Sequence, residues 1–178
     1  MRWSKLKRSL EDLLADAVKE HLQLHFTRYG RSPNTMMERA WITWDKVEVH
    51  NFSTVGWLRG TRSVATQMYE TGERKEPPVW YDFSEEVVKQ LEQSGVFSRQ
   101  QWYDALQTYL SLSIEQALHS SNALIRAWAM FDRRLGKRRL RPMEFKPSDP
   151  SFVKRWYQLR CQAEGIPVGS AGYDHEGR

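Results

Sequence analysis

Cysteine is almost absent from this chain, and so are long hydrophobic runs. Because Cys161 is the one cysteine, the sequence excludes an internal disulfide and a cysteine-based zinc site. No apolar run approaches the roughly 20 residues that a membrane-spanning helix needs. The basic residues at the N-terminus are followed by Glu11 and Asp12, whose charges interrupt the apolar stretch of a secretory signal. We therefore expect a cytoplasmic protein without membrane contacts.

The sequence also lacks the short motifs that mark common catalytic sites. It contains no P-loop, no glycine fingerprint of a dinucleotide-binding fold and no GxSxG nucleophile elbow. His21 and His25 lie four residues apart, but in a strand-like stretch without a third metal ligand. His50 and Asn51 show no ligand pattern either. We therefore expect no metal and no cofactor, and the sequence favours binding over catalysis.

Bulky apolar side chains are abundant. Apolar residues make up 40% of the 178 residues, and eight of the aromatic residues are tryptophans. Such a composition excludes intrinsic disorder, and the length suits one domain with its own hydrophobic core. We predict a single domain over residues 1–166 and a flexible tail over residues 167–178, where no periodicity is visible.

Three stretches of the N-terminal half predict strands. Residues 22–26 alternate between apolar and polar side chains, whereas residues 39–44 and 47–52 are rich in β-branched and aromatic residues. Asp45 and Lys46 separate the last two stretches, which predicts a hairpin.

Helical spacing of apolar residues dominates the rest of the chain. The expected helices cover about residues 3–19, 53–69, 84–91, 98–118, 122–136 and 150–164. Ser98 and Gln101 form a capping-box pattern, and Gly136 suits the end of a helix. The sequence therefore predicts an α+β fold, in which a small antiparallel sheet of about three strands packs against a mainly helical C-terminal half.

Positive charge is concentrated in one stretch. The formal net charge is +5. Residues 126–160 hold eleven basic and three acidic residues, a net charge of +8, whereas the rest of the chain has a net charge of −3. A local positive field attracts anionic partners such as nucleic acid or acidic protein faces.

Six basic side chains form the densest part of this stretch. They are Arg133, Arg134, Lys137, Arg138, Arg139 and Arg141. Together they could neutralise several phosphates of a nucleic acid. Two alternatives stay open: the cations could stabilise the negative end of a helix that ends at Gly136, or they could pair with acidic residues of the same chain.

Two tryptophans in the hairpin form the second candidate site. Trp41 and Trp44 lie an odd number of residues apart, so a strand places them on opposite faces of the sheet. One of them must point away from whichever face the helices cover, and an exposed tryptophan could anchor a protein partner. A second helical layer would instead cover it.

Four parts of the chain together resemble an uncharacterised family of small bacterial proteins. They are Arg2-Trp-Ser-Lys-Leu-Lys7, Thr27-Arg-Tyr-Gly30 with Arg39-Ala-Trp-Ile-Thr43, the segment 121–140 with its Asp132-Arg-Arg-Leu-Gly-Lys-Arg-Arg-Leu140 run, and Arg160-Cys-Gln-Ala-Glu-Gly-Ile166. The resemblance implies a bacterial cytoplasmic protein. It implies no activity, cofactor or catalytic residue.

The leading functional hypothesis is a non-catalytic binding protein that presents residues 133–141 to an anionic partner, nucleic acid or an acidic protein. The alternative is a protein-interaction module, such as a subunit or neutralising partner of another bacterial protein, that binds through Trp41 and Trp44. A third hypothesis is a small enzyme whose site no motif reveals. The sequence leaves the oligomeric state open, as well as the choice between RNA and DNA.

Overall fold

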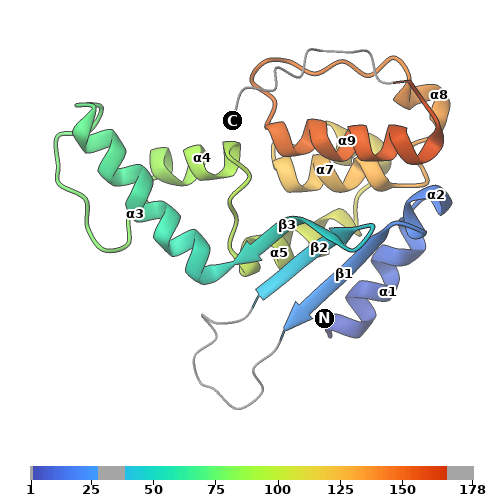
Figure 1. Ribbon diagram of the computed structural model, residues 1–178, viewed down its shortest axis with the longest axis horizontal. Coiled ribbons are helices and arrows are strands. Elements are labelled where there is room, and N and C mark those ends of the chain that lie inside the picture. Colours follow the sequence, from blue (N-terminus) through green and yellow to red (C-terminus); the bar gives the residue numbers. More distant parts are fainter. Residues whose placement is uncertain (1, 28–38, 168–178) are drawn as a thin grey trace.

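The computed structural model describes residues 2–27 and 39–167 and has an α+β fold (Figure 1). In this part of the chain, strands β1 (Leu22–Thr27), β2 (Arg39–Trp44) and β3 (Val47–Ser53) form one antiparallel sheet in the order β1-β2-β3. The helices are α1 (Trp3–Leu13), α2 (Asp16–Lys19), α3 (Thr54–Glu70), α4 (Glu85–Gln93), α5 (Arg99–Tyr109), α6 (Ile114–Leu118), α7 (Ala123–Phe131), α8 (Lys137–Leu140) and α9 (Ser151–Glu164). The predicted fold class is confirmed. The predicted tail over residues 167–178 lies outside the described residues except for Pro167.

A tight hairpin joins β2 to β3. Asp45 and Lys46 both have positive φ angles, 48° and 67°, as the two central residues of a type I′ turn require. The predicted hairpin therefore forms without a glycine in the turn. An irregularity in the register between Ile42 and Thr43 leaves Val49 without a partner in β2.

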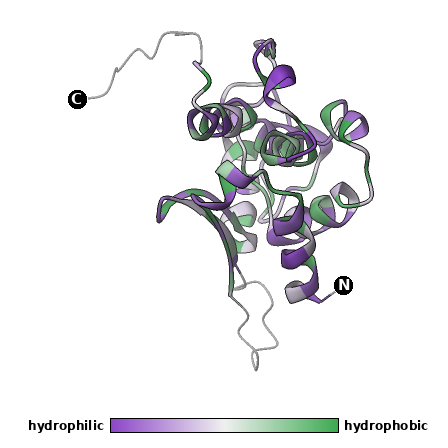
Figure 2. Ribbon diagram, turned by 90° about the vertical axis from the view of Figure 1, so that its right-hand side faces the viewer, coloured by the Kyte–Doolittle hydropathy of each residue, from purple (hydrophilic) through white to green (hydrophobic). Residues whose placement is uncertain are grey.

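Helices cover one face of the sheet (Figure 2). Alternation directs Ala40, Ile42 and Trp44 toward these helices, and all three side chains are buried. Behind them, α7 and α9 lie side by side, and their Trp128 and Trp156 rings meet edge to face with centroids 4.9 Å apart (Figure 1).

Helices α3 and α4 form a pair that extends away from the sheet (Figure 1). A second, small hydrophobic cluster of Ala65, Val87 and Leu91 lies between them. Ser53 caps α3: its hydroxyl oxygen accepts a hydrogen bond of 3.2 Å from the Gly56 amide.

The helix expected over residues 3–19 is interrupted at Leu14 and Ala15, which have extended backbone angles. The Ala15 amide donates to the carbonyl of Phe131 at 2.9 Å, and the Arg133 amide donates to the carbonyl of Leu13 at 2.8 Å. The chain therefore exchanges helical hydrogen bonds for a short pairing with the segment after α7.

Two C-terminal helices also end earlier than the apolar spacing predicts. The capping box of Ser98 and Gln101 forms, but α5 stops at Tyr109, and a second capping box at Ser113 starts α6. Helix α7 ends at Phe131 instead of Gly136, because Asp132 adopts an extended conformation. Gly136 precedes the four-residue helix α8.

Candidate functional site

The predicted basic residues lie on the link from α7 to α8 and just beyond it. Leu135 and Leu140 are fully buried and anchor this link to the core. The six basic side chains between and beside them therefore project outward. Since α7 ends before the first of these residues and has no basic residue in its last turn, they do not stabilise the negative end of that helix.

Arg134 is held by an acidic residue of the core. Its Nε and Nη2 atoms donate to one carboxylate oxygen of Asp132 at 2.9 Å and 2.6 Å, and Nη1 donates to the carbonyl of Leu112 at 2.9 Å. The hydroxyl of Tyr109 donates to the same oxygen of Asp132, whose side chain is fully buried. Hydrogen bonding to Asp132 raises the pKa of Arg134, and burial raises the pKa of Tyr109. Arg134 is therefore a structural residue.

Lys137 and Arg139 are also engaged within the chain. The Lys137 ammonium lies 2.7 Å from the carboxylate of Glu164, which also contacts Arg160 at 2.8 Å. Arg139 donates through both terminal nitrogens to Glu115 at 2.5 Å and 3.0 Å. Internal pairing, one of the two alternatives left open by the sequence, thus applies to half of the cluster.

The other three members of the cluster, Arg133, Arg138 and Arg141, are exposed. We call them the unpaired arginines, since no hydrogen bond or ion pair joins their side chains to residues 2–27 and 39–167. The hydrogen bond from Lys19 lowers the pKa of Asp16, and the positive charge of Arg133 adds to this shift, so Arg133 does interact with one carboxylate at longer range. Arg138 and Arg141 lie three residues apart in helical backbone, so they project from one side of α8.

The two hairpin tryptophans lie on opposite faces of the sheet, as expected. Trp44 belongs to the core, where it stacks on Phe131 with ring centroids 5.7 Å apart, so it offers no surface to a partner. Trp41 lies half-buried on the face without helices. His25 stacks on the Trp41 ring at 4.9 Å, and the Arg39 guanidinium lies 4.5 Å from its centroid. Neighbouring side chains therefore already contact the ring that the sequence proposed as an anchor.

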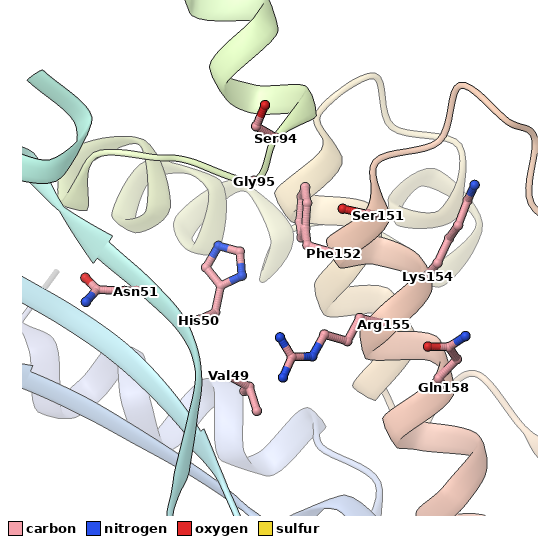
Figure 3. Close-up of a pocket in the computed structure, with 10 residues that line it drawn as sticks. All are labelled: Val49, His50, Asn51, Ser94, Gly95, Ser151, Phe152, Lys154, Arg155 and Gln158. Carbon is pink, nitrogen blue, oxygen red and sulfur yellow. The ribbon is translucent and has the colours of Figure 1, made fainter. Parts of the chain in front are cut away.

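A cleft of about 580 Å³ opens between β3, the end of α4 and the N-terminus of α9 (Figure 3). It is bounded by residues 49–51, by Ser94 and Gly95, and by the polar face of α9. That face consists of Ser151, Lys154, Arg155 and Gln158, and no residue that lines the cleft is acidic. Gly95 has a φ of +76°, and an added Cβ would lie 3.1 Å from the Phe152 ring, so the close approach of α4 to α9 depends on glycine.

His50 points from β3 into the space between Gly95 and Phe152 (Figure 3). Its Nε2 atom is buried and makes no hydrogen bond of good geometry with the described residues. Burial lowers the pKa of His50 to about 4; the positive charge of Arg155 acts in the same direction, and the backbone of Gly95 offsets part of the shift. The imidazole is therefore neutral at pH 7.

Sequence reasoning gave no role to this cleft. The spacing of Ser151, Lys154, Arg155 and Gln158 does mark one polar helix face, which was a visible signal. The inward direction of His50 was hidden, because it depends on the register irregularity in β3.

Most of the large apolar side chains that are exposed in the described chain lie in the segment between α3 and α4. Val79, Trp80, Tyr81 and Phe83 are between 48% and 73% exposed, and we call residues 79–83 the aromatic segment. Arg62 of α3 covers the Trp80 ring at 4.1 Å, and Phe83 stacks on Trp57 at 5.4 Å. Exposed apolar patches of this kind mark interaction sites.

Within the described ranges no cluster of histidine, cysteine and acidic residues could hold a metal ion, and no helix there could span a bilayer. The geometry defines a small α+β protein with a three-stranded antiparallel sheet and a mainly helical C-terminal half. The chain belongs to the SF0329 protein family, whose model matches residues 2–161, so the family resemblance seen in the sequence is confirmed. No curated protein and no solved structure matches the chain significantly.

A substitution of Arg134 should test its structural role. Arg134→Ala leaves the buried Asp132 carboxylate without its cation, so we expect the free energy of unfolding to fall by about 3 kcal/mol. Arg138→Ala, an exposed arginine of the same cluster, should change it by less than about 0.5 kcal/mol. Urea unfolding of both variants measures the difference, and equal stabilities would contradict the assignment.

The lowered pKa of His50 makes stability depend on pH. The pKa of His50 is 6.5 in the unfolded chain and about 4 in the folded protein, so between these pH values the unfolded chain binds more protons than the folded one. The contribution of His50 to the free energy of unfolding is therefore complete above pH 6.5 and is lost as the pH falls through 4. The loss amounts to roughly 3 kcal/mol. Unfolding of the wild type and of His50→Gln at a series of pH values should give curves that diverge across this window; parallel curves would refute the prediction.

Proposed function

We propose that this protein binds an anionic partner, nucleic acid in the first place, through its unpaired arginines. The single observation that carries the proposal is the division of the basic cluster. Three of its cations are engaged by Asp132, Glu115 and Glu164, whereas the unpaired arginines face solvent and form no ion pair with the described residues.

Arginine side chains suit phosphate better than most other anions. The planar guanidinium group can donate two parallel hydrogen bonds to phosphate oxygens. A nucleic acid strand repeats its phosphates at short intervals, so one partner could engage Arg138 and Arg141 together. The surrounding residues 126–160 carry a net charge of +8, which would also attract such a partner from a distance.

The test uses labelled RNA and double-stranded DNA of about 20 nucleotides, with affinity measured by fluorescence anisotropy across salt concentrations. We expect affinity to fall by more than about tenfold between about 50 and 200 mM salt. Arg138→Glu/Arg141→Glu should abolish binding at the higher concentration. It should also reduce the slope of log K against log salt by about two, one for each lost phosphate contact.

Lys46→Glu/Lys75→Glu is the matched control. It makes the same change in net charge with two exposed lysines remote in sequence from the cluster. If both double variants weaken binding equally, the interaction depends on total charge and the assignment to α8 fails. If neither weakens it, the unpaired arginines do not contact nucleic acid.

A second candidate function is protein binding, and the exposure of the aromatic segment favours it. A groove of about 200 Å³ beside this segment is lined by the apolar side chains of Val55, Leu58 and Trp80. Arg59 and Arg62 border the groove and have no carboxylate partner among the described residues. Apolar surface next to unpaired cations suits an acidic protein segment with apolar side chains.

This candidate predicts that a labelled peptide of alternating glutamate and leucine, about 15 residues long, binds saturably. Trp80→Ala removes apolar contact with the peptide, and Arg59→Glu removes a cation that faces its glutamates. Each substitution should weaken binding by about tenfold. Val47→Ala, which shortens an exposed apolar side chain of the hairpin, should have no effect. Equal binding of a lysine–leucine peptide would exclude an acidic partner.

A further inference from the structure

The cleft between β3 and α9 is distinct from the surface formed by the basic cluster. Ser151 at the first turn of α9 lines the cleft, whereas Lys137 of the cluster binds Glu164 at the last residue of the same helix. A helix of 14 residues separates these ends by about 21 Å. The two surfaces can therefore be tested separately.

We propose that this cleft binds a phosphate monoester, with the phosphate between Arg155, Lys154 and the first turn of α9, and the organic group against Val49 and Phe152. The inference does not depend on the proposed function. It combines the charge of the cleft, the unused hydrogen-bond donors around it and its size.

The charge of the cleft favours an anion. Arg155 reaches from α9 toward β3, whereas the side chain of Lys154, which also lines the cleft, extends in another direction (Figure 3). Neither cation has a carboxylate partner within the described residues, and none of the lining residues is acidic. The two positive charges are therefore not neutralised inside the cleft.

The first turn of α9 adds amide donors that no side chain caps; of these, the Val153 amide donates to the carbonyl of Pro150 at 3.0 Å. Pro150 occupies the N-cap position and has no side chain to accept a hydrogen bond, so the first amides of the helix receive no side-chain cap. The turn contains no acidic residue. Amides at a helix N-terminus, together with the hydroxyl of Ser151, form a favourable environment for phosphate oxygens.

His50 is the independent indication of a ligand. Its buried Nε2 atom lacks a hydrogen-bond partner of good geometry, and a buried polar atom left without one is costly. A neutral imidazole can donate one hydrogen bond to an oxygen of the ligand without adding charge. The phosphate would thus satisfy the cations, the helix amides and this imidazole together.

The size of the cleft identifies the class of ligand. A volume of about 580 Å³ lies within the range of small-molecule sites and exceeds the space that one phosphate ion fills. Val49 and Phe152 supply apolar surface beside the polar groups. A phosphate that carries an organic group would contact both the polar and the apolar lining of the cleft. Such a phosphate monoester occurs either in a free metabolite or at the phosphorylated end of a nucleic acid strand.

The test is a calorimetric titration of the full chain with adenosine 5′-monophosphate, adenosine and inorganic phosphate, alongside a short oligonucleotide with and without a 5′-phosphate. We expect saturable binding of the monophosphate below about 10 mM, at least about tenfold tighter than adenosine. Preference for the phosphorylated oligonucleotide over the monophosphate would assign the site to strand ends, and the reverse would assign it to a free metabolite.

Variants separate this site from the basic cluster. Lys154→Glu/Arg155→Glu should abolish binding of the monophosphate, whereas Arg138→Glu/Arg141→Glu should leave it unchanged. NMR supplies a second readout. The imidazole signals of His50 are assigned by their absence from the spectrum of His50→Gln, and the ligand should shift these signals in the wild type. Equal binding of adenosine, absence of saturable binding, or unchanged affinity in Lys154→Glu/Arg155→Glu would each overturn the proposal, whatever the outcome of the nucleic acid test.

Discussion

The buried carboxylate of Asp132 connects elements that are far apart in the sequence. It accepts hydrogen bonds from Tyr109 of α5 and from Arg134, while the backbone of Asp132 pairs with Leu14. A buried charge is strongly unfavourable unless it is paired and hydrogen-bonded, so the chain must bring these groups together. The extended backbone at Asp132 ends α7, and the pairing with Leu14 separates α1 from α2. The ends of these helices thus depend on the surroundings of one buried carboxylate.

The same constraint divides the positive charge of the protein. A dense run of arginines looks uniform in the sequence, yet its members have different physical roles. Arg134 compensates a buried charge, whereas Lys137 and Arg139 join α8 to the ends of neighbouring helices through Glu164 and Glu115. These pairings leave only the unpaired arginines available to a partner. A basic motif therefore overstates the positive surface of a folded protein when carboxylates lie within reach.

Local patterns predicted the parts of the fold that local interactions determine. Strand-like residue patterns located the strands, and the capping box at Ser98 was correctly placed, because a cap involves residues three positions apart. The break at Leu14 and the early end of α7 were missed, since both arise from contacts between residues more than 100 positions apart. Of the candidate residues, the sequence found the basic cluster but could not tell its paired members from its free ones. It missed the cleft because His50 and α9 meet only in three dimensions.

The N-terminus of α9 has neither a side-chain cap nor an acidic residue in its first turn. Helix α4 begins with Glu85 and Glu86, whose negative charges suit the positive end of the helix dipole. Helix α9 instead carries Lys154 and Arg155 one turn from its start, with no acidic residue in its first turn. Cations near a helix N-terminus are unfavourable by a few tenths of a kcal/mol to about 1 kcal/mol, and neither Lys154 nor Arg155 forms an ion pair with a described residue. Departures from local electrostatic preference concentrate at functional sites, where a ligand supplies the missing charge. An anion in the cleft would reverse the sign of this interaction, so binding and helix stability would increase together.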